Sequence, residues 1–155
     1  DFKLVTEIAC SHHEKINGTG YYRHLKGEEI PFGGRILAVS DVFDAITSKR
    51  HYRDKMPILN VITILIKDSG SHFDKNVVDC FLSISLDKIV QVFLTENELT
   101  FKREDEDFLK NYNLLDLYKI LSTKTEDDMN DEEKKFVNTF NLYYTAKSSD
   151  KKDSV

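Results

Sequence analysis

Two adjacent histidines and a carboxylate begin the part of the chain where chemistry is most readily expected. His12, His13 and Glu14 lead directly into a glycine-rich segment, NGTGYY, at residues 17–22. Histidine is the commonest protein ligand for transition metals, and glycine lets the backbone approach a bound group closely. Neighbouring residues on a helix point about 100° apart, so two adjacent histidines cannot share one ligand direction. The pair therefore suits a centre with more than one metal ion.

A second candidate ligand, Asp41, lies 28 residues after His13. The segment 34–48 is predicted to be a helix that is apolar on most faces, and such a helix belongs in the core. A buried carboxylate must be paired or bound to metal, and aspartate is a poor helix former. These facts favour a metal ligand over a structural aspartate that hydrogen-bonds a neighbouring loop. Asp44 is expected to be structural, bonded to the backbone, to Arg35 or to Arg50.

The motifs, taken in chain order, resemble the HD-GYP family, whose members are metal-dependent phosphodiesterases of cyclic di-GMP. They are HHE at 12–14, NGTGYY at 17–22, LKGEEIP at 25–31, GRILAVSDVFDA at 34–45, SKRHY at 48–52 and GSHFD at 70–74. The resemblance covers about residues 5–85. Asn17 stands where the family usually has aspartate, and Tyr22 stands where the family has the proline of GYP.

The resemblance implies a di- or trinuclear metal centre, with Fe or Mn expected, and ligands at His12, His13 and Asp41. Ions of this kind usually take about six donors each, so three protein ligands cannot complete the centre. The family places a His-Asp dyad and a lysine on an earlier helix, and this chain contains no His-Asp dipeptide. We therefore expect the chain to be the carboxyl-terminal part of the domain, truncated and inactive alone.

The resemblance also implies substrate contacts at Tyr21, Arg50 and Arg53, with no catalytic residue beyond the metal ligands. Arginine binds phosphate bidentately and stacks on bases, and an aromatic ring suits stacking on guanine. The alternative for the arginines is a solvated helix end, where the helix dipole favours cations. Glu14 is interpreted either as a residue that orients a ligand histidine or as part of a surface salt bridge. Three further histidines are not expected to be ligands: His24, His51 and His72.

Charge is distributed unevenly along the chain. Residues 1–60 carry nine Lys/Arg and eight Asp/Glu, whereas residues 96–155 carry ten and fifteen. The neutral to slightly basic surroundings of the motifs suit an anionic substrate, and the chain lacks the basic density of a module that binds a nucleic-acid polymer. No apolar run approaches 18 residues, so no membrane segment is expected. The predicted location is the bacterial cytoplasm, with Cys10 and Cys80 buried and reduced.

The predicted fold is all-α. It is a helical bundle that forms the carboxyl-terminal half of an HD-type phosphohydrolase domain, with extra carboxyl-terminal helices. The expected segments are 1–95 for the HD-GYP-like part, 96–146 for an acidic helical extension of no recognised family, and 147–155 for a disordered tail. Helices are predicted at 3–13, 34–48, 57–68, 75–84, 104–122 and 131–146, with a loop at 14–33. Residues 85–95 are expected either to extend the 75–84 helix or to form a strand. Asp74 is a candidate N-cap.

Three functional hypotheses remain open from the sequence. The first is a hydrolase that opens cyclic di-GMP to the linear dinucleotide or GMP in bacterial signal transduction. For it the resemblance implies an upstream receiver domain, as in a two-component response regulator, or a sensor domain, together with GGDEF cyclase partners. The second is a degenerate HD-GYP-like signalling or binding module, which Asn17, Tyr22 and the missing dyad favour. The third is a generic helical interaction domain with an incidental HHE motif.

Overall fold

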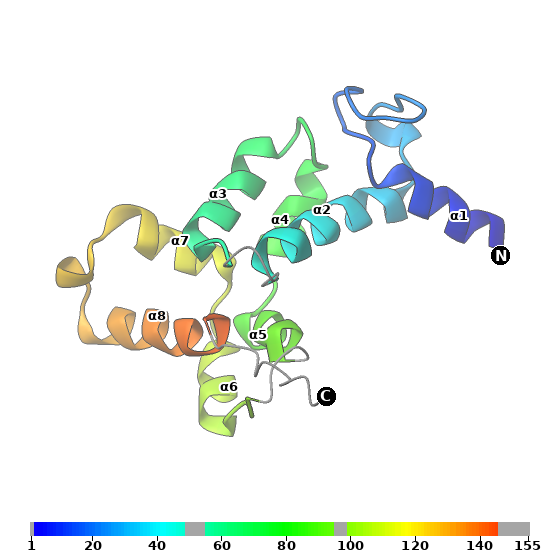
Figure 1. The fold of residues 1–155 in the computed structure, drawn as a ribbon. Coiled ribbons are helices and arrows are strands. Elements are labelled where there is room, and N and C mark those ends of the chain that lie inside the picture. Colours follow the sequence, from blue (N-terminus) through cyan, green and yellow to red (C-terminus); the bar gives the residue numbers. More distant parts are fainter. Residues whose placement is uncertain (1, 49–54, 95–98, 146–155) are drawn as a thin grey trace, which may run out of the picture. The chain divides into compact units, whose positions relative to one another are not determined.

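The computed structural model describes residues 2–48, 55–94 and 99–145, and this part of the chain is helical, with no strand (Figure 1). The predicted all-α class is confirmed. The α-helices are α1 (Phe2–Ser11), α2 (Phe32–Thr47), α3 (Ile58–Asp68), α4 (Lys75–Leu82), α5 (Leu86–Leu94), α6 (Arg103–Leu109), α7 (Leu114–Thr123) and α8 (Asp131–Tyr144). Two short 3-10 helices lie at Gly27–Glu29 and Glu126–Asp128. Within the described ranges, no helix is both long and apolar enough to cross a lipid bilayer.

Most helix predictions hold, and the exceptions have local causes. The first helix ends at Ser11, so the histidine pair follows the helix instead of lying on it. The long helix predicted at 104–122 is two helices, because Asn113 begins a new one. Its side chain accepts a hydrogen bond from the backbone N–H of Asp116, whose carboxylate accepts one from the N–H of Asn113. This reciprocal pair is a capping box, which marks a helix start. Residues 85–95 contain a separate helix, α5.

The chain divides into two compact units, Asp1–Leu82 and Ser83–Val155, here called the amino-terminal and carboxyl-terminal units. Helix α5 packs against α6 and α8 and so belongs to the second unit. The boundary at residue 95 predicted from the sequence, between the HD-GYP-like part and the acidic extension, stays a prediction. The predicted disordered tail, 147–155, lies outside the described residues.

In the amino-terminal unit, α2 contacts each of α1, α3 and α4. Val39 and Phe43 of α2 are buried, and the Phe43 ring meets Phe81 of α4 edge-on at 4.9 Å between centroids. A polar bond reinforces this packing, because Nη1 of Arg35 donates to Oδ2 of Asp74 at 2.6 Å. The predicted N-cap is confirmed, since Oδ1 of Asp74 accepts from the backbone N–H of Asn76 at 2.8 Å. Asp74 thus fixes the start of α4 and ties it to α2.

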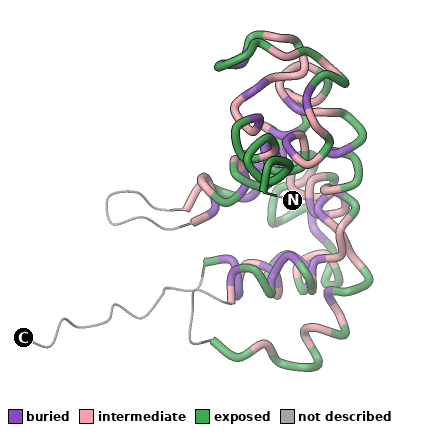
Figure 2. The backbone as a smooth tube through the Cα atoms, turned by 90° about the vertical axis from the view of Figure 1, so that its right-hand side faces the viewer, coloured by how far each residue is buried: buried purple, intermediate pink, exposed green. Residues whose placement is uncertain are grey.

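Two glycines let α1 lie directly against the start of α2. A Cβ on Gly33 would lie 2.7 Å from Cδ1 of Ile8, and a Cβ on Gly34 would lie 2.9 Å from Cβ of Ser11. Both distances are shorter than side chains tolerate, so the helix contact depends on these glycines. The rest of α1 is exposed along most of its length (Figure 2), including Phe2.

Two burial predictions are wrong. Helix α2 is not apolar all round: Ile36 and Leu37 are exposed, and so are Asp41 and Asp44. The buried residues of α2 are Gly34, Ala38, Val39, Phe43 and Thr47, and neither aspartate is among them. Asp44 accepts a hydrogen bond from the hydroxyl of Ser48, while Arg35 pairs with Asp74. Cys10 and Cys80, predicted to be buried, are both exposed.

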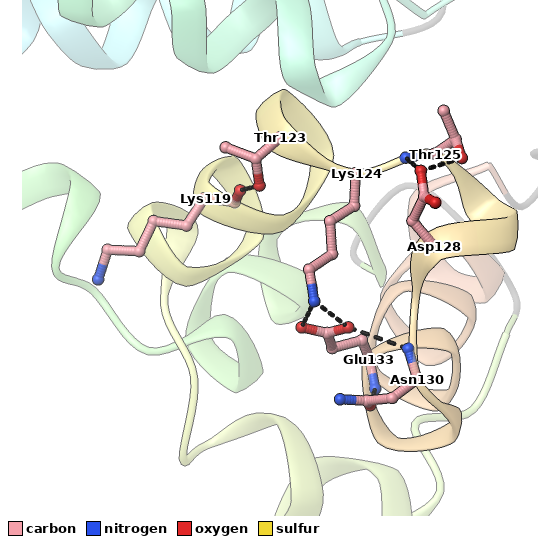
Figure 3. Close-up of polar contacts among 7 residues, drawn as sticks. All are labelled: Lys119, Thr123, Lys124, Thr125, Asp128, Asn130 and Glu133. Carbon is pink, nitrogen blue, oxygen red and sulfur yellow. Dashed lines mark hydrogen bonds and ion pairs between the residues drawn. The ribbon is translucent and has the colours of Figure 1, made fainter.

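The carboxyl-terminal unit has a dense aromatic interior. Phe140 is fully buried and stacks on Tyr144, which meets Phe93 of α5 edge-on at 5.2 Å between centroids. The start of α8 is held by polar contacts (Figure 3). Nζ of Lys124 lies 2.7 Å and 2.8 Å from the two carboxylate oxygens of Glu133, and the side chain of Asn130 accepts from the backbone N–H of Glu133.

Candidate active site

The amino-terminal unit contains a cavity of about 260 Å³ between the turn that follows α1, the middle of α2, the end of α3 and the turn that follows α3. Its ionisable lining includes His12, His13, Lys15, Asp41, Asp68 and His72. The structure therefore brings the three predicted metal ligands into one cavity. Tyr21, a predicted substrate contact, also lines it.

The histidine pair lies in a turn that closes when the N–H of Glu14 donates to the carbonyl of Ser11 at 3.1 Å. The two imidazole centroids are 3.8 Å apart. Nδ1 of His12 hydrogen-bonds to the carbonyl of Ala9, and because a carbonyl can only accept, Nδ1 must carry the hydrogen. The lone pair of the neutral ring is then on Nε2. Metal-binding histidines usually donate their other N–H to an oxygen in this way.

Tyr21 stacks on His13, with ring centroids 4.8 Å apart and an angle of 20° between the planes. Its backbone N–H also donates to the carbonyl of His13 at 3.4 Å. Tyr21 is nevertheless 51% exposed. One face of its ring lies against His13, and the rest of its side chain remains accessible. This arrangement leaves Tyr21 able to contact a bound aromatic base.

Glu14 has neither of the roles predicted for it. It is 4% exposed, and its two carboxylate oxygens accept from the backbone N–H groups of Arg23 and Leu25 at 2.7 Å and 3.0 Å. A buried carboxylate that accepts backbone hydrogen bonds satisfies groups the loop would otherwise leave unpaired. Glu14 therefore holds the glycine-rich loop closed beside the histidines.

Gly20 is the residue on which this closed loop depends most directly. A Cβ there would lie 2.4 Å from Cα of Glu14 and 2.4 Å from the backbone nitrogen of Lys15. Because both neighbours are backbone atoms, no rotamer change could relieve the clash. The glycine spacing seen in the sequence thus has a steric cause, although the sequence could not show that the contact was with the HHE motif itself.

The two departures from the family motif have different structural consequences. Oδ1 of Asn17 accepts hydrogen bonds from the N–H and the hydroxyl of Thr19, and an aspartate oxygen could accept the same bonds. Tyr22, in contrast, has φ of +84°. Proline is locked near −65°, so the loop of this protein adopts a conformation at residue 22 that the family proline could not.

Asp41 reaches the cavity from a face of α2 that carries small residues. Gly34, Ala38 and Asp41 follow the i, i+4, i+7 spacing of one helix face. Gly34 touches the end of α1, and Ala38 and Asp41 line the cavity. Asp41 is exposed, so the argument from burial that first favoured it as a ligand does not apply. The proposal that Asp41 is a metal ligand rests instead on its position in the same cavity as the histidines.

Sequence reasoning did not assign three cavity residues: Lys15, Asp68 and His72. They line one wall of the cavity, where backbone hydrogen bonds join two motifs that are distant in the sequence. The N–H of Ile16 donates to the carbonyl of His72 at 3.2 Å, and the N–H of Asn17 donates to the carbonyl of Ser71 at 2.9 Å. Nδ1 of His72 lies 3.4 Å from Oδ2 of Asp68. The i,i+4 spacing of this pair is a signal that the sequence already contained.

Imidazole and carboxylate donors in one cavity are the ligand types that Fe and Mn accept. Within residues 2–48, 55–94 and 99–145, however, no group of three or more His, Cys, Asp or Glu side chains is arranged to hold a metal ion. The donors have suitable chemistry and share a cavity, but they do not form a closed coordination site. The predicted substrate contacts Arg50 and Arg53 lie outside the described residues.

Comparison with known proteins adds information that is independent of this geometry. A family model described as an HD domain matches residues 2–77. A cyclic di-GMP phosphodiesterase of Vibrio cholerae is 44% identical over 81 residues, which is 52% of this chain and 16% of that protein. A cyclic di-GMP phosphodiesterase of Thermotoga maritima is 38% identical over 96 residues, which is 62% of this chain and 26% of that protein.

A third relative carries a different substrate in its name. The 3'3'-cGAMP-specific phosphodiesterase 2 of Vibrio cholerae is 41% identical over 80 residues, 52% of this chain and 15% of that protein. This chain therefore spans between 15% and 26% of the length of these three curated relatives. The aligned segment includes the cavity in the amino-terminal unit, since the family match covers residues 2–77.

Proposed function

Residues 2–77 of this chain belong to the HD domain family, and we propose that they contribute part of a metal-dependent phosphodiesterase site acting on a cyclic dinucleotide, cyclic di-GMP in the first instance. The observation that carries the proposal is the shared cavity of His12, His13 and Asp41. These residues come from two separate motifs of the HD-GYP resemblance. The names of the relatives support the same class of reaction.

In this proposal His12, His13 and Asp41 hold a di- or trinuclear centre of Fe or Mn, and the remaining ligands come from outside the described residues. When bound, such a centre lowers the pKa of a water and neutralises phosphoryl oxygens. The chain's own residues fix the geometry. The bond of His12 to Ala9 sets its tautomer, the stack on Tyr21 limits rotation of the His13 ring, and helix α2 presents Asp41.

Tyr21 is the proposed contact for a purine base, because its ring is both fixed against His13 and half exposed. Arg50 and Arg53 remain proposed contacts for the phosphates. The names of the relatives divide between cyclic di-GMP and 3'3'-cGAMP, so both cyclic dinucleotides belong in any assay. Upstream receiver or sensor domains and GGDEF partners remain part of the proposal.

A catalytically degenerate signalling or binding module is the second candidate. It is favoured by the lack of a closed three-ligand site among the described residues and by the left-handed conformation of Tyr22. Such a module would bind a cyclic dinucleotide or a partner protein without hydrolysing either. Metal content and turnover, measured on the same protein, distinguish the two candidates.

The test uses the natural protein that carries this sequence, prepared with Fe or Mn and assayed with cyclic di-GMP and 3'3'-cGAMP. We expect His13→Ala and Asp41→Ala each to lower turnover by more than roughly 100-fold, because loss of a ligand exceeds the 10- to 100-fold effect of removing an outer partner. Metal content, measured by elemental analysis, should fall in parallel.

Asp44→Ala is the matched control for Asp41→Ala. Asp44 is also exposed on α2, but it bonds to Ser48 and is absent from the cavity lining. Its substitution should leave metal content and turnover unchanged. Equal turnover in wild type, His13→Ala and Asp41→Ala would refute the site, and metal binding without turnover in the wild type would favour the degenerate module.

A further inference from the structure

The cavity has a wall that the proposed metal centre does not use. It contains Lys15 and His72, which the backbone bond between Ile16 and His72 holds next to each other. A second bond, from Asn17 to Ser71, continues this pairing of the two loops. These bonds fix the backbone positions from which the two side chains extend to line the cavity.

This wall carries a cationic side chain, Lys15, that can contact an anionic ligand. In the described part of the chain, Lys15 forms no ion pair with an acidic side chain. Two of the three carboxylates that line the cavity are already engaged. Glu14 accepts from two backbone N–H groups, and Asp68 lies against His72. Among the residues that the structure describes, Lys15 is therefore a cavity cation available to bind an anionic ligand.

The Asp68 carboxylate also determines which atom of His72 is available. It lies 3.4 Å from Nδ1, and because an ionised carboxylate only accepts hydrogen bonds, it favours the tautomer with hydrogen on Nδ1. Nε2 then carries the lone pair. An imidazole in this state accepts a hydrogen bond from a hydroxyl group, which a ribose supplies and a deoxyribose lacks at the 2′ position.

We propose that Lys15 and His72 form a ribose-phosphate subsite, in which Lys15 binds phosphate oxygens and Nε2 of His72 accepts from the neighbouring 2′-hydroxyl. Asp68 is a positioning residue that orients the imidazole. This inference rests on the proposed function, since it assigns these residues to the same substrate. It makes His72 a determinant of sugar specificity, separate from the metal ligands.

The test measures binding by calorimetry, so that it does not depend on turnover. The ligands are cyclic di-GMP and its 2′-deoxy analogue, and the protein is the natural one that carries this sequence. Lys15→Ala should weaken binding of both ligands by roughly 10- to 100-fold, the effect of losing a charged hydrogen bond. His72→Ala should weaken binding of cyclic di-GMP by roughly 10-fold and leave binding of the analogue unchanged. Asp68→Asn should reduce the discrimination between the two ligands.

Two matched control variants change residues that do not line the cavity. Lys67→Ala removes an exposed lysine from α3, and His24→Asn replaces an exposed histidine at φ of +54°, a conformation that asparagine tolerates. Neither should change the affinity for either ligand. Metal content should equal that of the wild type in every variant of this set, which separates the subsite from the metal centre.

Each other result contradicts the proposal in a recognisable way. Loss of metal in His72→Ala would make His72 a metal ligand. Equal weakening of both ligands by His72→Ala would reduce its role to packing. If the Lys15→Ala protein binds both ligands as tightly as the Lys67→Ala protein, then Lys15 does not contact the phosphate. A wild-type protein that binds metal but neither cyclic dinucleotide would overturn the subsite and leave the metal centre standing.

Discussion

Two pairs of helices, one pair in each unit of this chain, begin by different means. In the carboxyl-terminal unit, α7 and α8 begin with asparagine capping boxes. In the amino-terminal unit, α2 and α3 begin after Pro31 and Pro57, with no side-chain hydrogen bond to cap them. Their starts are set by the fixed φ of proline and by contacts elsewhere. Side-chain caps thus mark the starts of α7 and α8 in the second unit and of α4 in the first, whereas α2, α3 and α6 begin without one.

The surfaces of the two units show the same contrast. Phe136, Phe140 and Tyr143 of α8 are almost fully buried, whereas Phe2 of α1 is 89% exposed and Phe32 of α2 is 61% exposed. The second unit gains stability from aromatic packing. The first holds its cavity with glycine contacts and backbone hydrogen bonds. Among the described residues, the unit with the candidate chemistry buries fewer aromatic rings, and this difference can be measured.

The largest effect should come from removing an aromatic ring in the carboxyl-terminal unit. Phe140→Ala deletes a fully buried ring that stacks on Tyr144, and buried phenylalanine truncations cost about 3–5 kcal/mol. Phe32→Ala in the other unit removes an exposed ring and should change the free energy of unfolding by no more than about 0.5 kcal/mol. Urea denaturation followed by circular dichroism measures both.

A similar loss of stability in Phe32→Ala and Phe140→Ala would remove the contrast between the units. It would mean that the exposed ring packs against something in solution. Turnover at a temperature where Phe140→Ala remains folded should stay near that of the wild type, because α8 contributes nothing to the cavity lining.

The second effect concerns the polar bond that ties α2 to α4. Burial opposes ionisation of Asp74, but hydrogen bonds from Arg35 and from the backbone of Asn76 and Val77 outweigh it and lower its pKa below 3.8. Both side chains of the pair are mostly buried, at 18% and 11% exposed. Asp74→Asn keeps a good N-cap residue and removes the charge, so it should cost about 1.5–3 kcal/mol, as charged hydrogen bonds do.

The pH dependence of this cost has a defined sign. Because the folded pKa of Asp74 is depressed, the unfolded chain binds the proton more readily, and stability from this group rises with pH. The cost of Asp74→Asn should be constant at neutral pH and shrink as pH falls below about 4. Asp79→Asn is the control, since its exposed i,i+4 pair with Lys75 should matter little. A difference that persists unchanged at pH 2 would contradict the ionic account.

The sequence predicted what depends on neighbours along the chain. Asp74 was recognisable as a cap because the residue type and the following apolar pattern are local signals. Asn113 and Asp116 carried the same kind of signal, but the apolar spacing that continues across them suggested one long helix. The ends of α2, α3 and α8 follow from apolar periodicity, which tertiary packing did not override.

The sequence could not predict what depends on contacts between distant segments. The roles of Gly20 and Glu14 arise from a loop folding back on the HHE motif. Asp41 is exposed because of which face of α2 its neighbours cover, and hydrophobic content alone does not reveal that face. Lys15 and His72 meet only because two loops pair through their backbones. The family motifs indicated the cavity, whereas its second wall required the structure.

The smallest predicted effect comes from removing the side-chain cap of α8. The side chain of Asn130 accepts a hydrogen bond from the backbone N–H of Glu133 at 2.9 Å, and the Glu133 carboxylate accepts one from the backbone N–H of Asn130 (Figure 3). Asn130→Ala should lower the free energy of unfolding by about 1 kcal/mol. Asn76 lies in the first turn of α4, where Asp74 already supplies the cap. Asn76→Ala should therefore be neutral or stabilise by a few tenths of a kcal/mol, roughly the difference in helix propensity.

Hydrogen exchange can localise these two effects. Asn130→Ala should raise exchange in the first turn of α8 and leave α2 and α3 unchanged, because those helices start after prolines and do not depend on a side-chain cap. If Asn76→Ala, which leaves the Asp74 cap in place, costs as much as Asn130→Ala, the loss in Asn130→Ala cannot be assigned to its cap. The contrast between the units would then rest on aromatic packing alone.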